Sequence, residues 1–323
     1  MYLKKKFTIL QQIIINATNN IKVKSNKGWC VALSGGTDSL ALTAVASKVY
    51  PTTALIVDHG IYPNSNKIAK IAYKQAINLG CVKVKLLKVK IKNYFGGIEA
   101  AAREVRYKVL QSACKGLPVL LAHTLDDQAE TVLLGLGRGS GTRSIAGMKA
   151  HDPPWHRPLI GVRRILTKSI CIELNLIPWE DPHNYESRFA RSKLRHRVFP
   201  SMKEILGGGV SEALARTAVI LREDTYTLDL LAKLIITSIH HNNDKINVTK
   251  LRYLPDSLRL RIIRNWLLAS GACDLNYNQV KSVDQLITCW HGQDNIAIGS
   301  GLRKHRFFIK RYKNTLIVHI KTV

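Results

Sequence analysis

The residues most able to do chemistry lie in a short polar loop between two apolar runs. The loop reads Ser34-Gly35-Gly36-Thr37-Asp38-Ser39, with a short, apolar and partly β-branched run at 29–33 before it and an Ala- and Leu-rich run at 39–50 after it. Two glycines let the backbone turn sharply, and free N–H groups at the start of the following helix attract an anion. The loop is therefore predicted to hold phosphate, with the Asp38 carboxylate placing Mg²⁺ against it. It lacks the lysine of the GxxxxGK[ST] phosphate loop, and a simple tight turn is the alternative interpretation.

A second group of reactive side chains lies in the segment 122–131, which reads AHTLDDQAET. His123, Asp127 and Glu130 are spaced by four and three residues, so a helix opened by His123 would carry them on one face. Asp126 could cap that helix, because carboxylates in a first turn favour the helix dipole. Capping explains one acidic residue well, but it explains three acids and a histidine poorly. A cationic ligand, a metal ion or both would account for the surplus.

Alternating strands and helices along the first 200 residues position both groups. Apolar runs predict strands at 29–33, 52–58, 82–89 (whose alternation indicates one solvated face, or an edge strand) and 118–122. Helical spacing predicts helices at 39–50, 66–79 and 97–115 and another from 123. This order indicates an α/β fold with a doubly wound parallel sheet. Ligands of such sheets bind at the carboxyl ends of the strands, where Asp58 and His59 would also lie.

The rest of the chain predicts a linker and a smaller domain. A long helix is expected over 212–240, a basic amphipathic helix over 259–270, and basic strands on both sides of a turn at 312–314. Three glycines at 207–209 mark a boundary. We therefore predict a nucleotide-binding domain at 1–208, a helical linker at 209–245 and a small α+β domain at 246–323.

Composition indicates a polyanionic partner. The 49 Lys and Arg residues against 22 Asp and Glu residues give a net charge of +27, which attracts nucleic acid over a long range. The six cysteines show no CxxC and no Cys/His ligand spacing, which argues against zinc, an iron–sulfur cluster or a disulfide framework. No apolar run approaches the length of a membrane span. A soluble, cytoplasmic protein without a membrane partner is expected.

The motifs together resemble those of the tRNA(Ile)-lysidine synthases, which belong to the PP-loop ATP pyrophosphatases. The matching segments stand in the family's order: SGGTDS, VDHG, EAAAREVRY, AHTLDDQAET, RGSG, RPL, WEDPHN, RSKLR and FP. They cover about the first 200 residues, and the C-terminal part resembles the family's tRNA-binding domain in a short form. Tyr62, His183 and Ser192 depart from the family pattern, at positions that concern RNA contact more than the reaction.

The resemblance implies a two-step reaction with ATP and Mg²⁺. The wobble cytidine of a tRNA(Ile) with a CAU anticodon attacks the α-phosphate of ATP through O2, which gives an adenylated base and pyrophosphate. The ε-amine of L-lysine then attacks C2 and expels AMP, which leaves lysidine. A tRNA thiolase, or a tRNA-binding protein with a relic ATP site, is the alternative function. The oligomeric state stays open, with a homodimer as one option.

The resemblance also assigns roles to residues. Ser34, Gly35, Gly36, Thr37, Ser39, Asp58 and His59 would bind ATP, and Asp38 would hold Mg²⁺. Arg103 would stabilise phosphate or the intermediate, the alternative being an ordinary helix pair with Glu99. Asp127 and Glu130 would receive the lysine ammonium groups, with His123 as support. Contacts to tRNA are expected from Arg138, Arg191, Arg195, Arg303 and Arg306.

Overall fold

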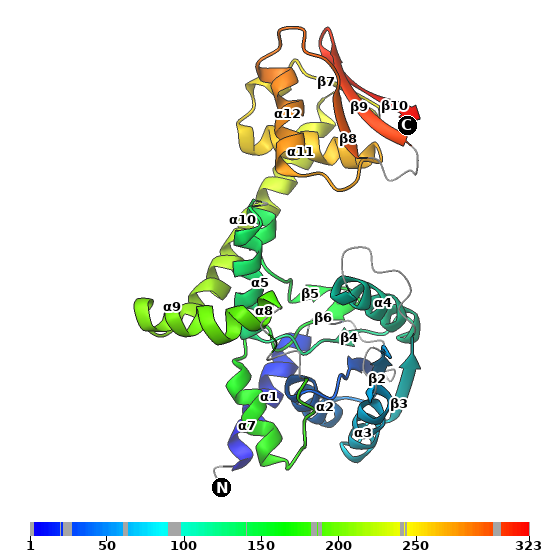
Figure 1. The fold of residues 1–323 in the computed structure, drawn as a ribbon, viewed down its shortest axis with the longest axis vertical. Helices are drawn as coiled ribbons and strands as arrows, with labels where there is room; N and C mark the ends of the chain where they lie inside the picture. The colour runs from blue at the N-terminus through cyan, green and yellow to red at the C-terminus, as the bar shows by residue number, and fades with distance from the viewer. Residues whose placement is uncertain are drawn as a thin grey trace. The chain divides into compact units, whose positions relative to one another are not determined.

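The computed structural model describes two compact units, each treated by itself (Figure 1). Unit 1 comprises residues 1–134 and 147–216, and unit 2 comprises residues 135–146 and 217–323. The described residues are 3–19, 21, 28–60, 64–89, 98–139, 141–181, 186, 189–239, 242, 244–299 and 305–322.

The described strands of unit 1 form a six-stranded sheet in the order β3-β2-β1-β4-β6-β5 (Figure 1). The strands are β1 Trp29–Ala32, β2 Thr52–Asp58, β3 Lys83–Lys88, β4 Val119–Leu120, β5 His151–Asp152 and β6 Trp155–His156. Neighbours are parallel from β3 to β6, and β5 runs antiparallel to β6. The predicted parallel sheet is confirmed, with β3 at its edge as expected. β1 lies between β2 and β4, so the loop after β1 opens near the middle of the sheet's carboxyl edge.

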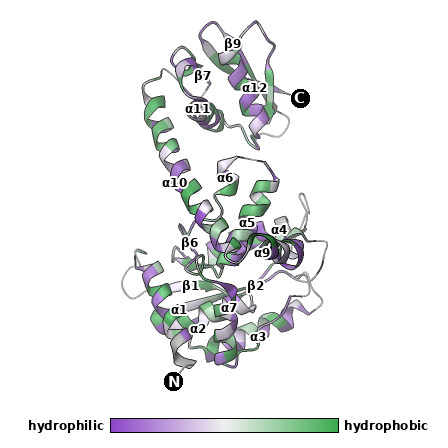
Figure 2. Cartoon of the chain, turned by 90° about the vertical axis from the view of Figure 1, so that its left-hand side faces the viewer, coloured by the Kyte–Doolittle hydropathy of each residue, from purple (hydrophilic) through white to green (hydrophobic). Residues whose placement is uncertain are grey.

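Helices cover both faces of this sheet, because successive residues of a strand point to opposite sides. Val31 and Ile56 pack into a core with α1, α2, α3 and α7, whereas Cys30 and Leu55 pack into a second core with α4. Helix α3 mixes hydrophilic and hydrophobic residues along its length (Figure 2), as expected of a helix that buries one face. These helices are α1 Leu3–Thr18, α2 Thr37–Val49, α3 Ser65–Asn78, α4 Ile98–Ala113 and α7 Arg164–Glu173.

Further helices of the chain also carry polar residues. They are α5 Leu125–Gly137, α8 Ala190–Lys193, the π-helical turn η2 Leu194–Val198, α9 Phe199–Leu206 and α10 Val210–Thr237. Single π-helical turns within helices often occur at functional sites. η2 joins α8 directly to α9, and it carries Arg195.

Unit 2 is an α+β unit with a four-stranded antiparallel sheet in the order β7-β10-β9-β8. Its elements are α6 Thr142–Ile145, β7 Lys245–Asn247, the 3₁₀ turn η3 Leu251–Tyr253, α11 Asp256–Ala269, α12 Tyr277–Thr288, β8 Ile296–Gly299, β9 His305–Tyr312 and β10 Thr315–Thr322. Trp266 of α11 and Phe307 of β9 are among its largest fully buried side chains. This confirms the smaller α+β part expected from the sequence. None of the helices among the described residues is long and apolar enough to cross a membrane.

Candidate active site

The loop between β1 and α2 is shaped to receive an anion. Gly35 has φ +87°, a conformation that favours glycine, and its carbonyl accepts the Trp179 N–H at 2.9 Å. Gly36 precedes the first turn of α2 and no side chain caps the helix. The hydroxyls of Ser34 and Ser39 lie 3.1 Å apart, and Ser34 Oγ accepts the Gly36 N–H. Hydroxyl groups within the loop thus fix its shape by hydrogen bonds, and the uncapped N-terminus of the 13-residue helix α2 follows it. An uncapped helix N-terminus suits a phosphate group.

The acidic segment begins its helix differently from the sequence prediction. His123 was expected to open the helix, but α5 begins at Leu125 and His123 precedes it. Thr124 caps the helix instead: Asp127 Oδ2 accepts the N–H and the hydroxyl of Thr124 at 2.8 and 2.9 Å. This reciprocal cap fixes the Asp127 carboxylate at the carboxyl edge of the sheet. Asp126 does not cap its own helix, because its carboxylate accepts the backbone N–H of Arg164 at the start of α7.

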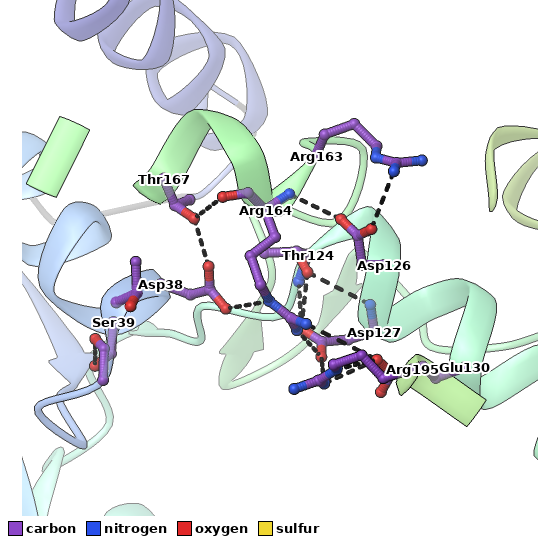
Figure 3. A network of polar contacts seen from close by, with 12 residues as sticks. Asp38, Ser39, Thr124, Asp126, Asp127, Glu130, Arg163, Arg164, Thr167 and Arg195 are labelled. Atoms are coloured by element: carbon purple, nitrogen blue, oxygen red, sulfur yellow. Dashed lines mark hydrogen bonds and ion pairs between the residues drawn. The ribbon is translucent and has the colours of Figure 1, made fainter. Parts of the chain in front are cut away.

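One arginine joins the phosphate loop to the acidic helix (Figure 3). Arg164 donates through Nε to Asp38 Oδ2 at 3.0 Å and through Nη2 to Asp127 Oδ1 at 2.5 Å. The other oxygen of Asp38 accepts the Thr167 hydroxyl. Both Arg164 and Thr167 lie in the first turn of α7, more than 120 residues after Asp38 in the chain. The two groups identified in the sequence therefore meet in space, and α7 brings the connecting residues.

Glu130 is enclosed by two further arginines. Its side chain is 2% exposed, and its Oε1 accepts from Nε and Nη2 of Arg195 at 2.9 and 2.8 Å. Arg191 reaches Oε2 at 3.2 Å and also donates to the Thr131 hydroxyl. The sequence predicts that the acidic residues of this segment lack protein partners, and the structure corrects this prediction. Arginines from α7, α8 and η2 neutralise acids that have no basic neighbours in sequence.

Burial and charge pull the pKa values of these carboxyl groups in different directions. Burial raises the pKa of Asp38 and of Glu130, although neighbouring guanidinium groups oppose it. Burial acts the same way on Asp127, but Arg164 and the Thr124 N–H outweigh it and hold the pKa of Asp127 below its ordinary value. Burial lowers the pKa of Arg164, but Asp127 and Asp38 together raise it above its usual range. Asp127 is therefore the carboxylate held most firmly in its ionised form.

Comparison with known proteins agrees with this geometry. Residues 8–202 match the family described as "PP-loop domain", and residues 247–317 match the "TilS substrate binding domain". A tRNA(Ile)-lysidine synthase of Mycobacterium leprae is 54% identical over 298 residues, which cover 91% of this chain and 92% of that protein. One of Mycolicibacterium paratuberculosis is 55% identical over 288 residues, 89% of either chain. The chain belongs to the tRNA(Ile)-lysidine synthase family.

A solved structure agrees with the fold of this synthase family member. The chain is similar to a U34-tRNA thiolase of Methanococcus maripaludis, with a TM-score of 0.55 and 19% identity. The match covers 68% of this chain and 80% of the thiolase. At this identity the likeness concerns the fold alone. The family assignment therefore rests on the sequence relatives.

Three arginines, Arg103, Arg106 and Arg157, lie close enough to His123 to affect its pKa. Burial, then Arg157, Arg103 and Arg106, lower the pKa of His123 from its ordinary 6.5 to about 3, although Asp127 opposes them. The imidazole is thus neutral at physiological pH. Arg103 itself is exposed, lies over the ring of Tyr107 and donates to its hydroxyl. The Glu99 side chain, its alternative partner, lies outside the described residues.

The carboxyl end of β2 adds two polar residues to this edge of the sheet. Asp58 is buried and accepts the Gly60 N–H at 3.1 Å. Burial and Arg106 lower the pKa of the adjacent His59. Nδ1 of His59 and Nδ1 of His123 are both buried, and neither has a hydrogen-bond partner among the described atoms. Such orphaned nitrogens suit a polar ligand at this edge.

The other residues predicted to bind substrate fall outside this cluster or outside the described chain. Arg138 and Arg306 are exposed residues of unit 2. Arg303, Tyr62, His183 and Ser140 of the RGSG motif lie outside the described residues. Ser192, predicted to concern RNA contact, is buried in α8.

Sequence reasoning missed Arg164 and Thr167. A signal was present, because Arg163 and Arg164 stand together at the start of a helix, where a cation is unfavourable. Such a pair indicates a carboxylate partner from elsewhere in the chain. Arg163 finds Asp126 at 3.4 Å and Glu212 at 3.0 Å.

Proposed function

We propose that the protein joins L-lysine to C2 of the wobble cytidine in tRNA(Ile) with a CAU anticodon. One observation carries the proposal: an anion-binding loop and a cation-binding carboxylate, Asp127, contact the same arginine side chain. The reaction needs this arrangement, because the ATP phosphates and the lysine amine must meet at one base. In the first step cytidine O2 attacks the α-phosphate and pyrophosphate leaves. In the second, the lysine ε-amine loses a proton and attacks C2, the C2–O bond breaks, and AMP leaves with that oxygen.

The loop residues would hold the departing pyrophosphate. The N–H groups at the start of α2 and the hydroxyls of Ser34, Thr37 and Ser39 supply donors without a positive side chain. Mg²⁺, when bound, would offset the charge developing on the phosphates. Asp38 fits the ion as a single carboxylate beside the loop, because Mg²⁺ takes its other ligands from phosphate and water. The described residues contain no cluster of three or more His, Cys, Asp or Glu side chains placed as metal ligands.

Lysine would bind at Asp127, with Glu130 deeper in the site. The Asp127 side chain is 15% exposed, whereas that of Glu130 is 2% exposed and held by two arginines. Asp127, with its lowered pKa, stays ionised to pair with an ammonium group. A carboxylate beside the ε-amine could also accept the proton that must leave before the attack on C2.

The basic residues divide into two groups under this proposal. Arg103 would approach the phosphate of the adenylated base. Arg191 and Arg195 would meet tRNA phosphates while they hold Glu130 in place. Arg138 and Arg306, both exposed, would contribute charge to tRNA binding, and so would Arg303. We place the enzyme in the cytoplasm, where tRNA is modified, and leave a homodimer as an untested option.

Separating the two half-reactions tests the proposal. Asp127→Asn should still release pyrophosphate from ATP with tRNA but should ligate lysine poorly. Loss of one partner from a buried charged pair costs about 2–5 kcal/mol, or roughly 30- to 5,000-fold in apparent lysine affinity. Asp38→Ala should instead abolish pyrophosphate release while tRNA still binds. If Asp127→Asn loses pyrophosphate release and keeps its lysine affinity, the acidic helix serves the nucleotide and lysine binds elsewhere.

A thiolase reaction and a non-catalytic role predict different products. All six cysteines are free, and none is placed in a metal-ligating group among the described residues. Mass spectrometry of nucleosides from the treated tRNA distinguishes lysine addition from sulfur addition. A protein without catalytic activity would exchange no pyrophosphate with ATP in the presence of tRNA.

A further inference from the structure

The guanidinium of Arg164 lies where a ligand cation of the acidic helix would lie. It contacts Asp38 at 3.0 Å and Asp127 at 2.5 Å, and its Nη1 is 3.9 Å from Glu130 Oε1 (Figure 3). Three carboxylates from two separate segments therefore share one positive group. A lysine ammonium that approached Asp127 would compete directly with this side chain.

The two aspartates do not depend on Arg164 for their positions. Asp38 is also held by the Thr167 hydroxyl, and Asp127 by the N–H and hydroxyl of Thr124. Arg164 in turn begins α7, where the helix dipole disfavours a cation. The side chain thus sits at an intrinsically unfavourable place for a positive charge, with only the carboxylates to retain it. A stronger anionic partner nearby would draw it away from Asp127.

We propose that Arg164 is a positioning residue that couples lysine binding to ATP binding. Without nucleotide, its guanidinium pairs with Asp127 and keeps lysine out. The ATP phosphates at the start of α2, next to Asp38, offer Arg164 a second anionic partner and release Asp127 for lysine. Lysine then binds only beside an activating nucleotide. The proposal rests on the proposed function in one respect, that Asp127 is the lysine-binding carboxylate.

Equilibrium dialysis of labelled L-lysine against the whole protein measures this coupling directly, without turnover. Coupling between two sites commonly changes affinity by about 5- to 150-fold, so α,β-methylene-ATP should tighten lysine binding to the wild type by about tenfold. Arg164→Gln removes the nearer of the two arginine charges at Asp127 Oδ1, since Arg164 lies 2.5 Å from that oxygen and Arg195 lies 3.7 Å from it. Without nucleotide, this variant should bind lysine about tenfold more tightly than the wild type does. The analogue should increase the lysine affinity of the variant by less than about threefold.

Arg163→Gln is the matched control, because Arg163, next to Arg164 in the chain, pairs with Asp126 and Glu212 rather than with Asp38 or Asp127. It should retain the wild-type coupling. The proposal is overturned if Arg164→Gln binds lysine more weakly than the wild type, or gains as much as the wild type from the analogue. If Arg164→Gln fails to fold, the wild-type measurement still tests the proposal. Equal affinity of the wild type for lysine with and without the analogue excludes the coupling.

Asp127→Asn separates the two proposals. If this variant loses lysine binding while Arg164→Gln behaves like the wild type, the lysine site is right and the role of Arg164 is wrong. If Asp127→Asn binds lysine normally, the assignment of the lysine site fails, and the role of Arg164 fails with it.

Discussion

Replacing Glu130 with glutamine measures how firmly the arginines hold the acidic helix. Nε and Nη2 of Arg195 donate to Glu130 Oε1 at 2.9 and 2.8 Å, and glutamine keeps the shape of the side chain but removes its charge. Hydrogen bonds to charged groups contribute about 1.5–3 kcal/mol each. Because 29% of the Arg195 side chain is exposed, water replaces part of this interaction. We expect a coupling free energy between the two residues of roughly 2–3 kcal/mol.

A double-mutant cycle of Glu130→Gln and Arg195→Gln isolates that coupling from the separate effect of each substitution. Because the chain has two units, a single unfolding curve would mix their transitions. Hydrogen exchange of α5 peptides in urea reports on the relevant unit. The exposed pair of Glu104 and Lys108 on α4 is the control, and its cycle should show a coupling of no more than about 0.5 kcal/mol. A value below about 0.5 kcal/mol for Glu130 and Arg195 would refute the pairing.

Two further predictions concern pH and salt. His123 has its pKa lowered from 6.5 to about 3, so the unfolded chain gains a proton first as the pH falls. The contribution of the neutral imidazole to stability is complete above pH 6.5 and is lost between pH 6.5 and about 3. In His123→Gln, the free energy of unfolding of unit 1 should therefore change less with pH in that range. Substituting Arg303, Lys304 and Arg306 with glutamine should lower the slope of log affinity for tRNA against log salt by about 2–3, since each phosphate contact contributes roughly 0.7–0.9. An unchanged slope would mean that tRNA binds elsewhere.

The fold was predictable because its signals are local. The runs that became β1 and β2 are apolar and short, and the intervening Ala- and Leu-rich segment is helical, so parallel pairing followed from their alternation. The phosphate loop was predictable for the same reason, because glycines between a strand and a helix constrain the backbone at that point. The strands β5 and β6 were not predicted. Each has two residues, too few to show a period.

The charge partners of the site were not predictable in the same way. Asp38 and Arg164 are separated by 126 residues, and Glu130 and Arg195 by 65. Their pairing depends on how α7 and η2 reach the carboxyl edge of the sheet, which no local pattern encodes. Sequence reasoning therefore treated the acids of α5 as unpaired. The cap at Thr124 was missed for a local reason. Asp and Thr are both favourable capping residues, so the sequence does not distinguish Asp126 from Thr124.

The arrangement explains why an acidic helix occurs in a chain of net charge +27. A strongly basic protein attracts tRNA but repels the ammonium groups of lysine, so lysine needs a local region that is not positive. Under the proposed function, the carboxylates of Asp38, Asp127 and Glu130 would provide it, and the arginines around them would limit the free-energy cost of burying negative charge before the ligand arrives. If Asp127 is the lysine site, its pairing with Arg164 would also make lysine binding an exchange of one cation for another. Such an exchange would depend on where the displaced guanidinium can go, and under our proposal the nearest anion would be the triphosphate at the start of α2.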